Sequence, residues 1–182
     1  MLVRKAYVEA WNYINAREKH RPKERGSEVV TNPDGTRTVR SGVILDNSRP
    51  VDDKAVIISG NPGIGKTWFL SYVLVERLLN ALPTIVQYAA TESEAGHILF
   101  DKHGVRFVPF FTEEVACNSS IWVLCDRKPI GLSRRTDEHD WFLLIATSPN
   151  AANTKAIEKH NQAETLYMAL WSWEEMVCTG WV

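Results

Sequence analysis

The sequence predicts an α/β fold of three layers, α/β/α, in which a mainly parallel sheet of about five strands lies between helices. Short apolar runs at 55–59, 84–90, 121–125, 142–147 and 165–170 are nearly continuous rather than alternating. This pattern is typical of strands that are covered on both faces. Helix-like segments separate most of these runs, and strands that alternate with helices favour parallel pairing.

The residues before 54 predict a small extension of this core. Residues 1–20 form an expected helix, because apolar side chains recur there at spacings that share one helical face. Two strand-like runs then flank a Pro-Asp-Gly turn signal at 33–35, which predicts a β-hairpin. We therefore divide the chain into an N-terminal extension, residues 1–53, and a core, residues 54–182. The apolar positions on the predicted helix are Leu2, Val3, Tyr7, Trp11 and Ile14.

The core contains further predicted elements between its strands. Residues 66–81 predict a helix that is apolar almost all round, as expected of a helix packed between the sheet and other elements, and it ends before Pro83. A hairpin around 101–104 is expected as an insertion between the second and third core strands. Residues 151–162 predict a polar surface helix, and 172–177 predict a short amphipathic one.

Composition excludes several classes of function. The net charge of -1 gives no general attraction to nucleic acid or membranes. The basic run from Arg17 to Arg25 predicts a solvated linker, with a nucleic-acid contact as the weaker alternative. Cys117, Cys125 and Cys178 form no CxxC pair, so we expect neither a disulfide framework nor a metal cluster. With no signal-like N-terminus and no run of about 18 apolar residues, we expect an intracellular protein, cytoplasmic or nuclear, without a membrane span.

The stretch from Gly60 to Thr67, GNPGIGKT, fits the pattern G-x-x-x-x-G-K-[ST] of a phosphate-binding loop, or P-loop. An apolar strand precedes it and a long helix follows it, which is the context that this loop requires. Glycines permit a sharp turn that aims successive backbone N–H groups at anionic oxygens, and the helix adds the positive end of its dipole. The sequence therefore predicts a site for a nucleotide.

The chemistry of such a site assigns roles to particular residues. Lys66 is expected to place its charge between the terminal phosphates, and the Thr67 hydroxyl is expected to bind Mg²⁺. Asp126 follows the apolar run 121–125, at the strand end where ligands of α/β sheets bind, and is expected to hold Mg²⁺ through its water shell. The candidate nucleotide-binding residues are Gly60, Asn61, Pro62, Gly63, Ile64, Gly65, Lys66, Thr67, Trp68 and Ser148, the catalytic candidates are Lys66 and Asp126, and the metal ligands are Thr67 and Asp126.

Hydrolysis is less well supported than binding. Many P-loop ATPases place Glu directly after the metal-binding Asp to position the attacking water, but here Arg127 follows. The other acids nearby have no assigned role: Asp137, Glu138 and Asp140 lie in the next loop, and Glu174 and Glu175 follow the last strand.

Polar residues at the end of run 142–147 are further candidates. Thr147 and Ser148 could contact the γ-phosphate or the water, and a plain Ser-Pro turn explains them equally well. Arg134 and Arg135 could act as an arginine finger on a neighbouring subunit, although an exposed loop accounts for them more simply.

The order of these segments resembles the P-loop domain of Crinkler-type and retrotransposon-hot-spot-type proteins. The resemblance covers about residues 28–178 and includes "NPDGT", the "ILFDKHGV" hairpin, "IWVLCD", "FLLIATSPN" and "LYMALWSWEEMV". Its most particular part is the Trp-Ser-x-Glu-Glu segment at 171–175. The resemblance implies an ATPase module related to AAA-like and STAND-like regulators. The chain departs from that plan because it stops at Val182, where little remains for a helical lid.

Three functions are therefore carried forward. The first is Mg-dependent binding and hydrolysis of ATP, or another NTP, by a switch or motor module. The second is a nucleotide-binding interaction module without turnover, and the third is a small-molecule or nucleotide kinase. Trp171, Trp173 and Trp181 would form a surface for a protein partner if they are exposed.

Overall fold

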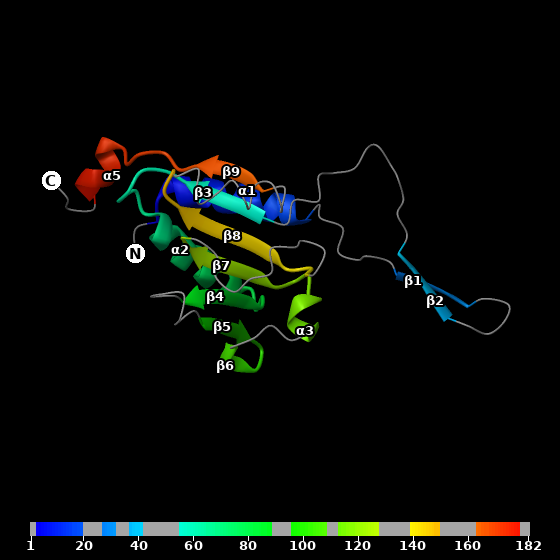
Figure 1. Cartoon of the computed structure of the whole chain (residues 1–182). Helices are drawn as coiled ribbons and strands as arrows, with labels where there is room; N and C mark the ends of the chain where they lie inside the picture. The colour runs from blue at the N-terminus through cyan, green and yellow to red at the C-terminus, as the bar shows by residue number, and fades with distance from the viewer. Residues whose placement is uncertain are drawn as a thin grey trace.

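The structure of the protein is a computed structural model, and it describes residues 3–19, 27–31, 37–41, 55–88, 96–108, 113–127, 139–149 and 163–178. Its centre is a seven-stranded sheet with the order β6-β5-β4-β7-β8-β3-β9 (Figure 1). The strands are β3 (Ala55–Ser59), β4 (Thr84–Tyr88), β5 (Gly96–Asp101), β6 (Gly104–Val108), β7 (Trp122–Asp126), β8 (Phe142–Thr147) and β9 (Glu164–Tyr167).

The sheet is larger than predicted and partly antiparallel. The five neighbouring strands β4, β7, β8, β3 and β9 pair in parallel, as expected. β5 pairs antiparallel with β4, and β6 pairs antiparallel with β5. The prediction of about five strands treated the hairpin as an insertion, whereas its two strands extend the sheet. Pairing with β5 satisfies backbone groups of β4 that would otherwise be unpaired at the edge of the sheet.

Helices cover the two faces of the sheet unequally in the part of the chain that the structure describes. α1 (Lys5–Lys19) and α2 (Lys66–Leu79) pack on one face, in a core cluster that also contains Val56 and Trp122. The other face carries the single turn of α3 (Glu113–Ala116), whose Val115 packs with Ile57 and Val123. β3 and β8 are buried along their whole lengths, as continuous apolar runs predict.

The N-terminal helix is part of the main core. Tyr7, Trp11 and Ile14 are buried against α2 and the sheet, whereas Val3 is exposed. α1, which the sequence assigned to the N-terminal extension, therefore packs with residues of the core. The boundary between residues 53 and 54 stays a prediction. The predicted β-hairpin forms as β1 (Ser27–Thr31) and β2 (Arg37–Ser41), paired antiparallel. Its turn, the basic run from 20 onward and the predicted helix 151–162 lie outside the described residues.

The order of the strands decides what meets at the carboxyl edge of the sheet. β8 lies between β3 and β7, with Ser59 paired to Thr147 and Asp126 paired to Ala146. The residues that follow β3, β7 and β8 therefore come together at one edge. α2 begins at this edge, and α5 (Trp173–Cys178) lies at the same end of the sheet (Figure 1).

Candidate phosphate-binding site

The loop between β3 and α2 has the backbone that its glycines predict. Gly63 has a φ of 81° and Gly65 a φ of 94°, a left-handed region that side chains with a Cβ seldom adopt. Gly65 is also the residue that precedes the first turn of α2. The free N–H groups of that first turn therefore face the loop, as an anion-binding helix terminus requires.

Lys66 bends back across this loop. Its Nζ donates hydrogen bonds to the carbonyls of Gly60 and Asn61, each at 2.8 Å. Partial burial lowers the pKa of the Lys66 ammonium, and the charge of Asp126 acts in the opposite direction. The ammonium is thus tethered at the mouth of the loop by two neutral acceptors, which an anionic oxygen can replace.

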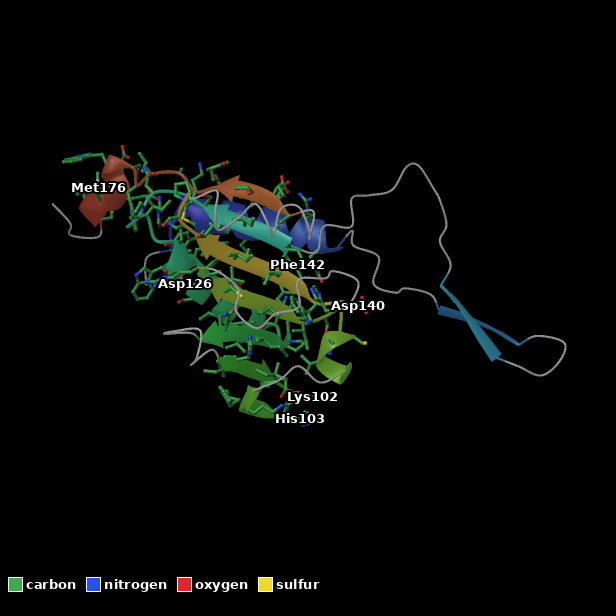
Figure 2. All side chains as sticks on the ribbon, in the orientation of Figure 1. Lys102, His103, Asp126, Asp140, Phe142 and Met176 are labelled. Carbon is green, nitrogen blue, oxygen red and sulfur yellow. The ribbon has the colours of Figure 1, made fainter. Side chains whose placement is uncertain are left out.

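Thr67 and Asp126 meet although 59 positions separate them in the chain. The Thr67 hydroxyl donates to Asp126 Oδ2 at 3.1 Å, and both side chains are exposed. One residue is fixed by the start of α2 and the other by the end of β7. Figure 2 shows Asp126 at the end of the sheet where α2 begins. A hydroxyl and a carboxylate side by side are oxygen donors of the kind that Mg²⁺ prefers.

Arg127 has an unusual backbone at the point where the sequence departs from the pattern typical of P-loop ATPases. Its φ is 80°, and its N–H donates to the Ala146 carbonyl at 2.7 Å. A residue other than glycine is strained in this region, and such strain is common at functional sites. The backbone therefore leaves the extended conformation of β7 directly after Asp126.

Thr147 and Ser148 end the strand between β3 and β7. Thr147 is buried, and Ser148 is exposed. Because Thr147 pairs with Ser59, Ser148 lies next to the start of the loop in the order of the sheet. Trp68, on the first turn of α2, is 70% exposed, so its indole is open to solvent beside the loop.

The acids and arginines considered for hydrolysis do not gather at this edge. Asp140 precedes β8 and therefore lies at the opposite edge, as Figure 2 shows. Glu174 is exposed on α5, and Glu175 is paired with Arg4. The remaining candidates, Arg134, Arg135, Asp137 and Glu138, lie outside the described residues.

Two residues at the loop were missed by the sequence analysis. Arg4 Nη1 donates to the Ile64 carbonyl, and the Tyr7 hydroxyl donates to the Gly65 carbonyl, each at 2.7 Å. The sequence placed Tyr7 on an apolar helix face and assigned no role to Arg4. The partners in these two contacts are separated by 60 and 58 positions in the chain. No sequence pattern links residues so far apart, so only the packing of α1 reveals the contacts.

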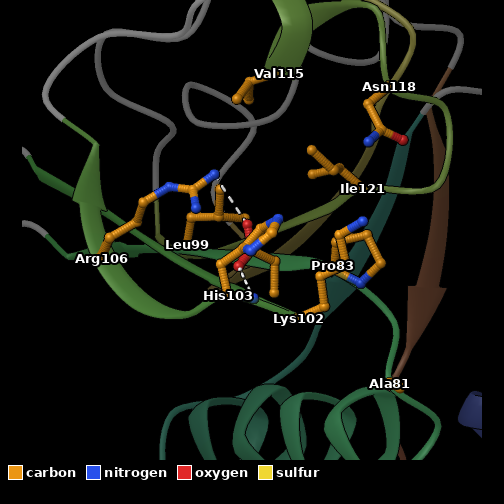
Figure 3. Close-up of a pocket in the computed structure, with 10 residues that line it drawn as sticks. Ala81, Pro83, Leu99, Lys102, His103, Arg106, Val115, Asn118 and Ile121 are labelled. Carbon is orange, nitrogen blue, oxygen red and sulfur yellow. Dashed lines mark hydrogen bonds and ion pairs between the residues drawn. The ribbon is translucent and has the colours of Figure 1, made fainter.

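A separate hollow lies at the opposite edge of the sheet. Figure 3 shows the residues that line this hollow. Its volume is about 250 Å³. Within it Arg106 forms an ion pair with Asp101 at 2.9 Å, and Asp101 also accepts the His103 N–H. The Asp101 carboxylate thus offsets the charge of Arg106 in this hollow. The residues that line it are Ala81, Pro83, Leu99, Asp101, Lys102, His103, Arg106, Val115, Asn118 and Ile121.

Comparisons with known proteins add little to this geometry. No family model matches the chain, and no curated protein matches it either. Among solved structures, the chain is similar to the crystal structure of THEP1 from the hyperthermophile Aquifex aeolicus, with 13% sequence identity and a TM-score of 0.35. The match covers 69% of this chain and 95% of that one. A likeness of this size carries no argument about function, so the site rests on its own residues. Among the described residues, every helix is too short or too polar to span a bilayer.

Proposed function

We propose that the loop from Gly60 to Thr67 binds the phosphates of a nucleoside triphosphate together with Mg²⁺. The observation that carries this proposal is the contact between Thr67 Oγ1 and Asp126 Oδ2 at 3.1 Å, directly beside a glycine loop with left-handed backbone. A chance glycine turn accounts for neither the contact nor the Lys-Thr pair. Lys66 supplies the positive charge, and the first N–H groups of α2 supply the remaining donors.

Thr67 and Asp126 fit a magnesium ion. Mg²⁺ retains most of its water and takes one or two protein oxygens alongside the phosphates. The hydroxyl of Thr67 is suited to direct binding, and the carboxylate of Asp126 is suited to contact through water. The ion would neutralise charge on the phosphates, and Ser148, at the end of the neighbouring strand, is proposed as a further contact to them.

Hydrolysis of the bound ATP or other NTP is a further activity proposed for this site, and it has less support than binding. The residue after Asp126 is Arg127, where many P-loop ATPases have the Glu that positions the attacking water. This favours the second function, a nucleotide-binding interaction module that holds the nucleotide without turnover. A kinase would need an arginine-rich segment that closes over its substrate, and Arg134 and Arg135, the adjacent arginines that could form one, lie outside the described residues.

The Crinkler and retrotransposon-hot-spot resemblance also stays a proposal, since the comparisons do not support that specificity. Its Trp-Ser-x-Glu-Glu segment has a physical role here. Ser172 N–H donates to Glu175 Oε2 at 2.9 Å, and Glu175 N–H donates to Ser172 Oγ at 3.2 Å, which is a capping box at the start of α5. Nearby, Leu170 and Trp173 are 66% and 62% exposed, which supports a protein partner at this segment.

The proposal is tested with Lys66→Ala and, as a matched control, Lys102→Ala at the opposite edge of the sheet. Binding of ATP and GTP with Mg²⁺ is measured by calorimetry, and phosphate release is measured in parallel. We expect the Lys66 variant to bind about tenfold or more weakly, because a charge-assisted contact contributes about 1.5–3 kcal/mol. The Lys102 variant should bind like the wild type. Absence of binding in the wild type, or equal binding by the Lys66 variant, would contradict the proposal.

A further inference from the structure

Two side chains from the N-terminal segment hold successive peptide groups of the phosphate loop. Arg4 binds the carbonyl of Ile64, and Tyr7 binds the carbonyl of Gly65, both at 2.7 Å. The approach is close, since a Cβ added to Gly65 would lie 2.2 Å from the Tyr7 hydroxyl oxygen. The Gly65 carbonyl also accepts the Phe69 N–H of α2 at 2.9 Å. These contacts lie on the side of the loop that faces α1.

The geometry of the peptide bond turns these contacts into control of the N–H groups. A trans peptide is planar, and its carbonyl and N–H point in opposite directions. When Arg4 holds the Ile64 carbonyl, the N–H of Gly65 must point away from α1. When Tyr7 holds the Gly65 carbonyl, the N–H of Lys66 is directed in the same way. Successive N–H groups aimed together form the concavity in which an anion binds.

Arg4 is itself held firmly by the C-terminal segment. Arg4 is 3% exposed, and its guanidinium donates to both carboxylate oxygens of Glu175, at 3.3 and 3.1 Å. It also donates to the carbonyls of Ala169 and Leu170, and its Cζ lies 4.1 Å from the centre of the Trp171 ring. A planar guanidinium with this many partners has one orientation available, so the Ile64 carbonyl has a fixed donor.

Tyr7 is held by aromatic packing. Its ring centre lies 5.5 Å from that of Phe69 and 6.1 Å from that of Tyr72, both on α2. Burial, offset in part by Arg4, raises the pKa of the Tyr7 hydroxyl, so the group stays a hydrogen-bond donor throughout the neutral range. The donor to the Gly65 carbonyl is therefore fixed in both position and protonation.

We propose that Arg4 and Tyr7 are positioning residues for phosphate binding, which pre-orient the Gly65 and Lys66 N–H groups by anchoring the carbonyls of Ile64 and Gly65. This inference rests on the proposed nucleotide-binding function and adds two residues to it that never touch the ligand. Without them, the glycine-rich loop would have to be ordered when the ligand binds, at a cost to affinity.

The test compares Tyr7→Phe with Tyr13→Phe. Each variant loses one hydroxyl from α1, but Tyr13 donates to Glu164, away from the loop. Affinity for Mg-ATP and for inorganic pyrophosphate is measured by calorimetry at a temperature where all proteins are folded, and the melting temperature is measured without ligand. We expect Tyr7→Phe to bind both probes about fivefold more weakly, the effect of one lost hydrogen bond, and Tyr13→Phe to bind like the wild type.

Arg4→Lys is the second variant. Lysine keeps the charge but lacks the planar fork that reaches Ile64 and Glu175 together, so we expect a loss of about tenfold in pyrophosphate affinity. If Tyr7→Phe and Arg4→Lys lower only the melting temperature and bind pyrophosphate normally, the proposal is overturned while the nucleotide site stands. If the wild type itself binds neither probe, both the positioning role and the proposed function are overturned.

Discussion

At the scale of single residues, the site depends on a few contacts between groups that are distant in the chain. Lys66 donates hydrogen bonds to two carbonyls of its own loop, and the Thr67 hydroxyl donates one to the carboxylate of Asp126 on another strand. Each contact can be replaced by one to a phosphate oxygen or a hydrated metal ion. The residues of the loop are thus ordered in a way that suits the proposed ligand.

The proposed role of Asp126 in binding Mg²⁺ can be separated from its hydrogen bond with Thr67. Asp126→Asn keeps an oxygen that accepts the Thr67 hydroxyl but removes the negative charge. We expect affinity for Mg-ATP to fall about tenfold, to the level of the wild type without the metal, because a hydrated cation loses its charged partner. Calorimetry with Mg²⁺ and with a chelator provides the measurement. A variant that still gains affinity from Mg²⁺ as the wild type does would show that Asp126 is not a metal ligand.

At the scale of elements, α2 is defined at both ends by backbone geometry. It begins at the loop and ends in a Schellman motif, in which the Leu82 N–H donates to the Arg77 carbonyl and the Ala81 N–H donates to the Leu78 carbonyl. The buried Arg77 then ties this end to the starts of β4 and β7, through the Thr84 hydroxyl and the Ser120 carbonyl. The helix that presents the loop is thereby anchored to the sheet at its far end.

The end of α2 offers a stabilising substitution. Ala81 has a φ of 53°, at the position where the Schellman motif favours glycine. We expect Ala81→Gly to raise the free energy of unfolding by about 0.5–1 kcal/mol, because relief of strain exceeds the entropy cost of glycine. Urea denaturation measures the change. The control is Ala10→Gly inside α1, which should lower stability by about 1 kcal/mol. If both variants are less stable than the wild type, the backbone of Ala81 is not in the left-handed conformation.

At the scale of the whole molecule, the two ends of the described chain meet behind the phosphate loop. Arg4 precedes α1 and Glu175 lies on α5, and they form an ion pair at 3.1 Å. α1 also contributes buried side chains to the cluster that α2 and the sheet share. The N-terminal helix therefore belongs to the same packed body as the loop.

A matched pair of substitutions on α1 tests this integration. Ile14 is fully buried and Val8 is 39% exposed on the same helix. We expect Ile14→Ala to lower the free energy of unfolding by about 2–4 kcal/mol, the cost of a cavity in a packed core, and Val8→Ala to change it by less than about 1 kcal/mol. Denaturation is followed by tryptophan fluorescence. An Ile14 variant as stable as the wild type would mean that α1 is peripheral.

Much of the fold was predictable because its signals are local. The apolar runs predicted β3, β4, β7, β8 and β9, and the turn signals predicted both hairpins. The extension of the sheet by β5 and β6 was not predicted, since a hairpin and its neighbours show the same local pattern whether or not they pair. Gln87 pairs with His97 across β4 and β5, and this pairing is decided by the tertiary structure, not by the local sequence.

The sequence by itself determined the loop, because its glycines, Lys66 and Thr67 act through backbone conformation and spacing within one strand-loop-helix unit. It also indicated Asp126 as a metal ligand, from its place at a strand end. Only the tertiary structure decided that Asp126 reaches Thr67, since this depends on β8 lying between β3 and β7. It alone brought Arg4 and Tyr7 to the carbonyls of Ile64 and Gly65, because contacts between distant segments follow from packing and leave no periodic trace in the chain.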